Sequence, residues 1–216
     1  MTTTSRRGAG SVASLVYATV ARGIGRLQAA PDSPTTRASL AHLRANLGVH
    51  PGRDPRIWGL TIGGLNTTDG RDEPTSAEIA VHGAMTLYAH HQRARTEPMS
   101  EQGVGLGTAV RRCEYRIYGV DANETPLRRR FDGAVMASDV ATLQQRLRSL
   151  VGQMRGEAVA LDYPQLAKDL YSWQCPGGAD AVRRRWARQY YRVGPESTPH
   201  HNATSEAQGP TYLEED

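Results

Sequence analysis

The chain has 216 residues and a formal net charge of +4, with 38% hydrophobic and only 6% aromatic side chains. Such a composition favours two compact helical bundles over one large globule. Two cysteines, Cys113 and Cys175, are too few for a disulfide scaffold, and no apolar run approaches the ~18 residues of a membrane span. We therefore expect a cytoplasmic protein with no membrane segment, cofactor or metal.

Helical periodicity dominates the first half of the chain, where apolar side chains recur every three or four residues. Thr75 and Glu78 have the spacing of a capping box, which places a helix start after Thr75. Residues 51–74 are rich in Gly, Pro, Asp and Thr and favour a long loop, within which residues 58–62 could form a short strand. We expect helices over about 11–27, 35–47, 76–93 and 106–113.

The second half shows the same periodicity more cleanly, and no strand alternation runs through it. Helix starts are indicated by Thr125, by Ser138 and by Asp162 before Tyr163-Pro164. We expect helices over about 125–135, 138–154, 162–173 and 180–191. The fold class is therefore all-α, with two small helical bundles at residues 1–118 and 119–192 and a disordered C-terminal tail at 193–216.

Charge is distributed unevenly between these parts. Lys168 is the only lysine among the 26 basic residues, so the other 25 are arginines. Residues 193–216 hold five acids and no Lys or Arg, which leaves 26 basic against 17 acidic side chains, or +9, over residues 1–192. This balance favours a polyanionic partner, and arginine suits phosphate oxygens. Ordinary solubility charge and a GC-rich genome remain alternative explanations.

The arginines gather in clusters on the expected helices. Consecutive arginines cannot all point one way because each residue turns a helix by about 100°, but Arg184 and Arg188 share a face. That face differs from the apolar stripe of Val182, Trp186 and Tyr190, so these arginines are either solvated or bound to anions. No aromatic residues are interleaved to stack bases, which favours contact with the nucleic-acid backbone over base reading.

Other motifs point away from catalysis. The glycines of 103–107 resemble a phosphate loop, but neither a preceding strand nor a Gly-Lys-Ser/Thr sequence accompanies them, so a flexible turn is favoured. His82, His90 and His91 are eight and nine residues apart, whereas helical metal ligands need a four-residue spacing. We expect these histidines at the surface and no enzymatic activity.

Seven short motifs follow one another between residues 11 and 192. They are Leu40–Gly48, Leu87–His91, Gly105–Ala109, Arg129–Phe131, Leu161–Tyr163, Leu166–Trp173 and Arg183–Arg188. In this order and spacing the chain resembles the CasB family, the small subunit of the type I-E CRISPR surveillance complex Cascade. The resemblance is most specific after Thr125.

The resemblance implies a non-catalytic, all-α subunit that is present in paired copies beside the backbone and large subunits of the complex. In that position it would contact the guide RNA, the target DNA strand and the displaced DNA strand, and it would stabilise the R-loop. By position, the family's basic contacts fall on Arg44, Arg129, Arg130 and Arg146. Clustering alone adds Arg111, Arg112, Arg148, Arg183, Arg184 and Arg188.

Two other functions stay open at this point. One is a stand-alone helical DNA-binding regulator, for which residues 162–191 offer two successive helices, although Pro176-Gly-Gly would make a poor fixed turn between them. The other is an enzyme with a phosphate-containing ligand at residues 103–107.

Overall fold

The structure is a computed structural model that describes residues 3–65, 72–120 and 124–192, with side chains from residue 11 onward. The described residues form helices and no strand, and the single bridge between Ser100 and Leu161 is isolated. The predicted all-α class is thereby confirmed. The predicted tail at 193–216 lies outside the described residues.

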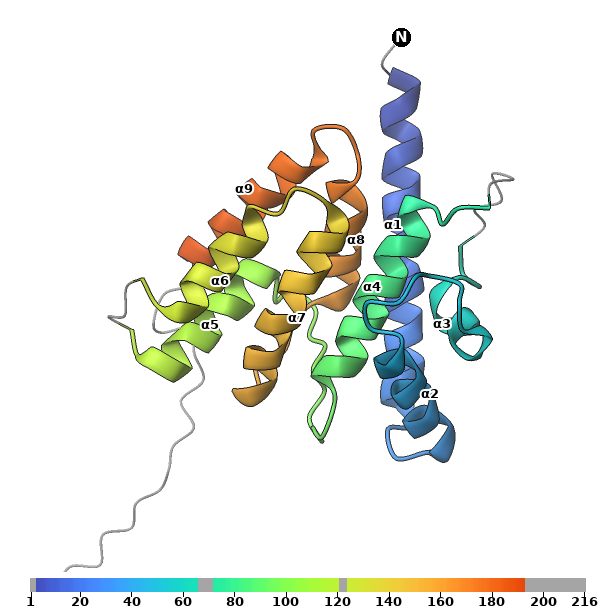
Figure 1. Ribbon diagram of the computed structural model, residues 1–216, viewed down its shortest axis with the longest axis horizontal. Helices are drawn as coiled ribbons and strands as arrows, with labels where there is room; N and C mark the ends of the chain where they lie inside the picture. Colours follow the sequence, from blue (N-terminus) through green and yellow to red (C-terminus); the bar gives the residue numbers. More distant parts are fainter. Residues whose placement is uncertain (1–2, 66–71, 121–123, 193–216) are drawn as a thin grey trace, which may run out of the picture.

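Nine α-helices and one 3-10 helix are found in the described part of the chain (Figure 1). They are α1 (Thr3–Ala29), α2 (Pro34–Ala45), η1 (Pro55–Ile57), α3 (Trp58–Thr61), α4 (Ser76–His91), α5 (Leu106–Tyr118), α6 (Pro126–Val135), α7 (Val140–Gly156), α8 (Tyr163–Trp173) and α9 (Gly178–Arg192).

Local capping explains where most of these helices begin. The capping box of α4 is confirmed: the Glu78 N–H donates to Thr75 Oγ1 at 3.3 Å, and the Thr75 N–H donates to Glu78 Oε2 at 2.8 Å. Asp139, rather than the predicted Ser138, caps α7, because its carboxylate accepts the Thr142 N–H at 2.8 Å. Ser138 instead donates its hydroxyl to Asp139 at 2.8 Å.

The predicted short strand at residues 58–62 is wrong, since this stretch continues from η1 into α3. Asp54 caps η1 by accepting the Arg56 N–H at 3.0 Å, and proline at the next position fits the first turn of a helix. Buried Ile57 then anchors the turn, and its carbonyl accepts the Thr61 hydroxyl at 2.9 Å. The local cap therefore outweighs the β propensity of the apolar run.

Helix packing does not follow the order of the chain. Helix α8 lies against α1 and α4, while α5 lies along α9, α6 packs on α7, and α7 contacts α4 (Figure 1). The buried hydrophobic side chains form one cluster that draws on helices from both halves. The division into two bundles, at residues 1–118 and 119–192, is a statement about which parts fold independently as well as about which parts touch. It stays a prediction.

Close packing of α5 on α9 accounts for two of the glycines near residue 105. A Cβ atom on Gly107 would overlap the carbonyl oxygen of Trp186 and the backbone nitrogen of Tyr190, and one on Gly105 would overlap the side chain of Gln189. The Gly107 N–H donates to Gln189 Oε1 at 3.2 Å. These glycines let two helices approach, so a phosphate-binding role is not needed to explain them.

Two of the three helical histidines are buried, contrary to the surface positions predicted for them. His82 and His91 are 4% and 0% exposed, because α4 is enclosed by neighbouring helices on several sides. His91 Nδ1 shares a hydrogen bond of 3.0 Å with the Tyr163 hydroxyl, and His82 Nε2 lies 3.1 Å from the Asn46 carbonyl. Burial lowers the pKa of His91 to about 3, so this ring is neutral in the folded protein at pH 7.

Candidate nucleic-acid interface

Basic side chains from three parts of the chain meet around the C-terminal end of α4. His90 is half-buried there, Arg93 follows the helix, Arg44 comes from α2, and Arg148 and Arg155 come from α7. Burial lowers the pKa of His90, and the positive charges of Arg155, Arg148, Arg93 and Arg44 lower it further, so the four arginines lie near enough to disfavour protonation of this ring. We call these five residues the His90 cluster.

The cluster follows from the way α7 and α2 pack on α4. Arg148 and Arg155 are seven residues apart, which is about two turns, so they share one side of α7. The buried side of that helix carries Leu147, Leu150 and Met154. Helix α2 buries Leu43 against the core, and Arg44, the next residue, is half-buried.

The loop after α4 is tied directly to the end of α7. Arg95 donates to the carbonyl oxygens of Arg155 and Gly156, the second at 2.7 Å. These carbonyls belong to the last turn of α7, where a cation is favourable because they form the negative end of the helix dipole. The link holds the loop that follows Arg93 against the end of α7.

The four arginines of the His90 cluster have no carboxylate within ion-pair distance among the described residues. The ion pairs of the described part are Arg56–Asp54, Arg111–Glu114, Arg128–Asp132, Arg183–Asp180 and Arg185–Asp169. Burial and the charge of Arg93 lower the pKa of Arg44, as expected when like charges are held together. The cluster is therefore an uncompensated positive surface that an anion would stabilise.

A second basic surface runs along the exposed side of α9. Arg184, Arg188 and Arg192 are exposed and spaced by four residues, so they form one row, which we call the α9 ridge. A hollow of about 440 Å³ lies along it, bordered also by Arg185 and Gln189. This arrangement confirms that Arg184 and Arg188 share a face, as their spacing predicts.

Two of the predicted site arginines instead have extensive contacts inside the fold. Arg111 pairs with buried Glu114 at 2.7 Å and lies 4.2 Å from the centre of the Tyr115 ring. Arg183 donates to the Val135 carbonyl at 2.8 Å and also contacts the Ala137 carbonyl, Asp180 and the Trp173 ring. Both guanidinium groups hold helices together in this structure.

The other four predicted residues are Arg112, Arg129, Arg130 and Arg146, and the hydrogen bonds found for them within the described residues do not involve the His90 cluster. Arg129 donates to the Glu124 carbonyl at 3.0 Å, Arg146 donates to the Gly133 carbonyl, and Arg130 is exposed. Arg112 is half-buried, and its Nε has no hydrogen-bond partner within the described residues. Nucleic-acid contact by these four residues stays a prediction.

The family resemblance predicts Arg44 and clustering in the sequence predicts Arg148, but neither predicts His90, Arg93 and Arg155. The seven-residue spacing of Arg148 and Arg155 is a signal that could have linked these two. No local pattern connects His90 and Arg93 to Arg44, because their proximity depends on how α2 packs on α4.

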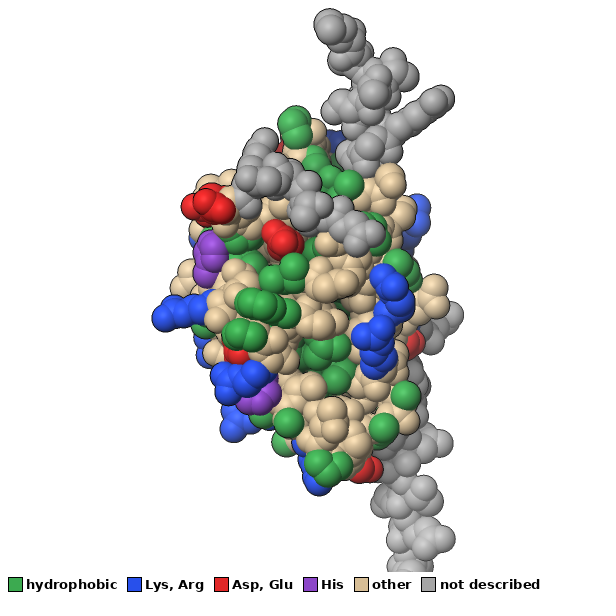
Figure 2. All heavy atoms as spheres, turned by 90° about the vertical axis from the view of Figure 1, so that its right-hand side faces the viewer, with side chains coloured by type: hydrophobic (Ala, Val, Ile, Leu, Met, Phe, Trp, Pro, Cys, Tyr) green, Lys and Arg blue, Asp and Glu red, His purple; other side chains and the backbone are tan. Residues whose placement is uncertain are grey.

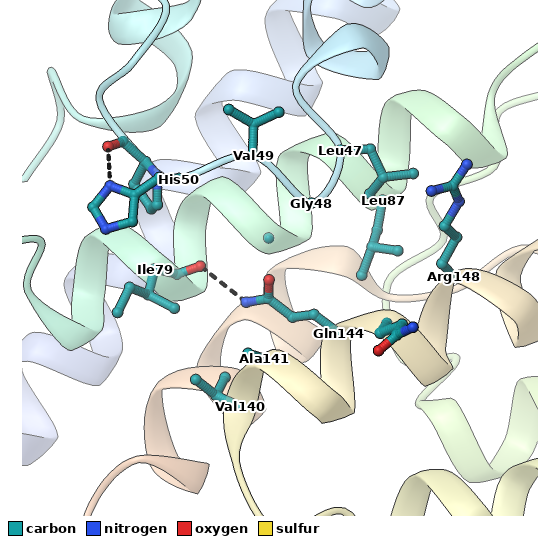
Figure 3. Close-up of a pocket in the computed structure, with 13 residues that line it drawn as sticks. Leu47, Gly48, Val49, His50, Ile79, Leu87, Val140, Ala141, Gln144 and Arg148 are labelled. Carbon is teal, nitrogen blue, oxygen red and sulfur yellow. Dashed lines mark hydrogen bonds between the residues drawn. The ribbon is translucent and has the colours of Figure 1, made fainter.

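An apolar pocket of about 530 Å³ lies next to the His90 cluster, between the segment after α2, helix α4 and helix α7 (Figure 3). Its lining includes Leu47, Val49, Leu87 and Val140, and Arg148 stands at one side of it. Arg148 therefore borders both an apolar hollow and the basic cluster. Figure 2 shows hydrophobic side chains at the centre of the adjoining face, over α2 and α3, with Lys and Arg side chains toward its edges.

Neither a membrane span nor a metal cluster is found in the described part of the chain. No helix there is long and apolar enough to cross a bilayer. No group of three or more His, Cys, Asp or Glu side chains within 11–65, 72–120 and 124–192 could hold a metal ion.

Comparison with known proteins identifies the family. Residues 39–191 match the family model described as CRISPR-associated protein Cse2. The chain belongs to the Cse2 family. A crystal structure of CasB from Thermobifida fusca is similar, with a TM-score of 0.67 and 35% identity over 82% of this chain and 98% of that one.

A second solved structure and the curated sequences complete the comparison. The crystal structure of M. ruber CasB shares the fold, with a TM-score of 0.58 and 22% identity over 78% of this chain and 90% of that one. None of the curated protein sequences matches the chain. The resemblance drawn from the sequence motifs is thus confirmed for the family.

Proposed function

We propose that this chain is a non-catalytic small subunit of a type I-E Cascade complex and that it binds nucleic-acid backbone through the His90 cluster. Family membership supports a Cascade subunit. The observation that carries the backbone-binding role is the gathering of four arginines around His90 without a carboxylate partner among the described residues. Phosphate oxygens are the anions that arginine forks bind best.

The salt dependence of this binding follows from counterion release. If each of the four arginines neutralises one phosphate, log affinity falls with log salt with a slope of about −2.8 for a single strand and about −3.6 for a duplex. These contacts carry no base information, so binding is independent of sequence. The α9 ridge adds three more cations that can track a strand.

Such contacts are sufficient for the role that we propose in the assembled complex. R-loop formation exchanges a DNA duplex for an RNA–DNA duplex of similar stability, so a few backbone contacts can shift the balance. The subunit would hold the guide–target strands or the displaced strand, next to the backbone and large subunits and a second copy of itself, in the cytoplasm during antiviral defence.

A stand-alone DNA-binding regulator is less well supported by the geometry. A recognition helix must expose side chains that reach base edges. Helix α8 is enclosed by α1 and α4, and α9 buries Val182, Trp186 and Tyr190. Gln189, which could read a base, accepts the Gly107 N–H instead. The exposed residues of α9 include Arg184, Arg188 and Arg192, which suit phosphates better than base edges.

The test is R-loop formation by the complex reconstituted with and without this subunit. We expect the subunit to raise the fraction of target duplex that is opened, and to do so equally for targets of unrelated sequence paired to matching guides. A variant with Arg44→Gln and Arg148→Gln should assemble normally and lose most of that increase. An unchanged R-loop yield with this variant would contradict the proposed site, and failure of the subunit to assemble would contradict the proposed function.

A further inference from the structure

The α9 ridge holds like charges at a spacing where they repel one another. Arg184 and Arg188 are four residues apart, as are Arg188 and Arg192, and like charges at this spacing destabilise a helix. The acid of α9 itself is engaged elsewhere, because Asp180 pairs with Arg183. Buried Asp169 pairs with Arg185 and accepts the Trp186 indole N–H at 2.6 Å. The ridge therefore lacks an acidic partner among the described residues.

The chain itself supplies an acidic segment directly after the ridge. Residues 193–216 follow Arg192 and contain five acids with no Lys or Arg. The acids occur at both ends and in the middle of the segment: Glu196, Glu206, Glu214, Glu215 and Asp216. The charge of −5 on this segment is opposite to that of the ridge and of the hollow that borders it.

Chain length permits contact between the two. The ridge is eight residues long from Arg184 to Arg192, or about 12 Å along the helix axis. Glu196 is four residues beyond Arg192, and Glu206 is fourteen residues beyond, which corresponds to at most ~50 Å of extended chain. Every acid of the segment can therefore reach the ridge. Covalent linkage gives the segment an effective concentration in the millimolar range.

We propose that residues 193–216 dock on the α9 ridge of the same molecule and exclude nucleic acid from it. The docking step stands independently of the function proposed above, whereas the exclusion step rests on it. The contact is made by exposed charges, so it is weak and screened by salt, with a screening length that falls from ~10 Å at 0.1 M to ~3 Å at 1 M. The segment would keep the ridge covered until a polyanion of higher charge density displaces it.

Docking can be tested through the single lysine of the chain. Zero-length carbodiimide coupling joins a lysine amine to a carboxylate that contacts it, and Lys168 is the only native lysine. Arg188→Lys in the full chain places a second amine on the ridge, and Arg26→Lys places a matched one on the exposed side of α1. Coupled peptides are mapped by mass spectrometry at a protein concentration where the chain is monomeric.

We expect coupling from position 188 to the acids of 193–216 within one molecule, with at least a fivefold excess over position 26 at 50 mM salt and its loss at 500 mM. Equal coupling from both positions would overturn docking, because it would show no preference for the ridge. Coupling only between molecules would also overturn it and would assign the ridge to a second copy.

The exclusion step has its own measurement in the full-length protein. Neutralising the five acids by Glu→Gln and Asp→Asn should tighten binding of a single-stranded oligonucleotide roughly three- to tenfold at 50 mM salt, with no difference at 300 mM. Coupling at position 188 with unchanged affinity would overturn exclusion and leave docking standing. If neither protein binds the oligonucleotide, the proposed function fails while the coupling result still decides docking.

Discussion

Removing two arginines from the His90 cluster should weaken nucleic-acid binding by an amount that the structure sets. Each arginine that neutralises a phosphate contributes about 0.7 to 0.9 to the salt slope. Loss of Arg44 and Arg148 together therefore reduces the slope by about 1.4 to 1.8. At 0.1 M salt this corresponds to a roughly 25- to 60-fold loss of affinity if the salt-independent part is unchanged.

The double variant Arg44→Gln and Arg148→Gln has a matched control in Arg22→Gln and Arg26→Gln. Both pairs lower the net charge by two, and the control pair lies on the exposed side of α1. Fluorescence anisotropy with a labelled 20-nucleotide strand, repeated from 50 to 300 mM salt, gives both affinity and slope. The control should lose no more than about threefold, through its effect on the overall field.

Protein stability provides a second readout for this variant. Because the cluster holds like charges without a carboxylate partner among the described residues, removing two of them should leave the melting temperature unchanged or slightly higher. Equal affinity losses for the cluster variant and the α1 control would refute the reasoning, since net charge alone would then explain binding. A large drop in melting temperature for the cluster variant would show that these arginines are structural.

Three further predictions follow from individual residues. Phosphates bound at the cluster should raise the depressed pKa of His90. Binding should then take up protons, and affinity should increase as the pH falls from 7.5 to 6.0. NMR titration of the His90 ring with and without oligonucleotide checks this. The pKa of His91 is about 3 when folded and ordinarily about 6.5, so stability is lost as pH falls below 6.5, by about 1.4 kcal/mol per unit for this ring. Urea unfolding at pH 7.5 and 5.0 should therefore differ by about 2 kcal/mol more in the native protein than in His91→Asn, and equal differences would contradict the assignment. Gly107→Ala should lower the free energy of unfolding by about 1–3 kcal/mol, because the new methyl group overlaps the Trp186 carbonyl, and an unchanged urea midpoint would show that α5 and α9 pack less tightly.

Local signals predicted the helix starts well, because caps depend on residues three positions apart. Thr75, Thr125 and Asp162 each accept the backbone N–H three residues on, as their positions in the sequence suggest. The stretch at 58–62 was harder to predict because its apolar run is too short to show a period, and the cap at Asp54 decides its conformation.

Features that depend on tertiary packing could not be predicted in the same way. His82 and His91 look polar in the sequence, but α4 is enclosed by its neighbours, and twelve of its sixteen residues are buried. A run of alanine, valine and leucine through this helix was the available sign of burial on all sides. The interleaving of α8 with α1 and α4 has no local signature at all.

The candidate site also combines features that local sequence predicts with features that depend on tertiary packing. Counting arginines predicted a polyanionic partner but could not separate guanidinium groups with partners from those without. Arg111 and Arg183 look like Arg148 in the sequence, yet the first two contact carboxylates and ring faces within the fold. Only the packed structure brings Arg44 and Arg148 near the same histidine, where both charges lower its pKa.

The most direct measurement is a structure of the assembled complex bound to guide RNA and a target duplex. If four guanidinium groups bind sugar-phosphate chains as proposed, phosphate oxygens should lie within about 3 Å of Arg44, Arg93, Arg148 and Arg155. Density that places RNA and DNA elsewhere on the subunit, with a protein surface covering these four side chains, would contradict the account.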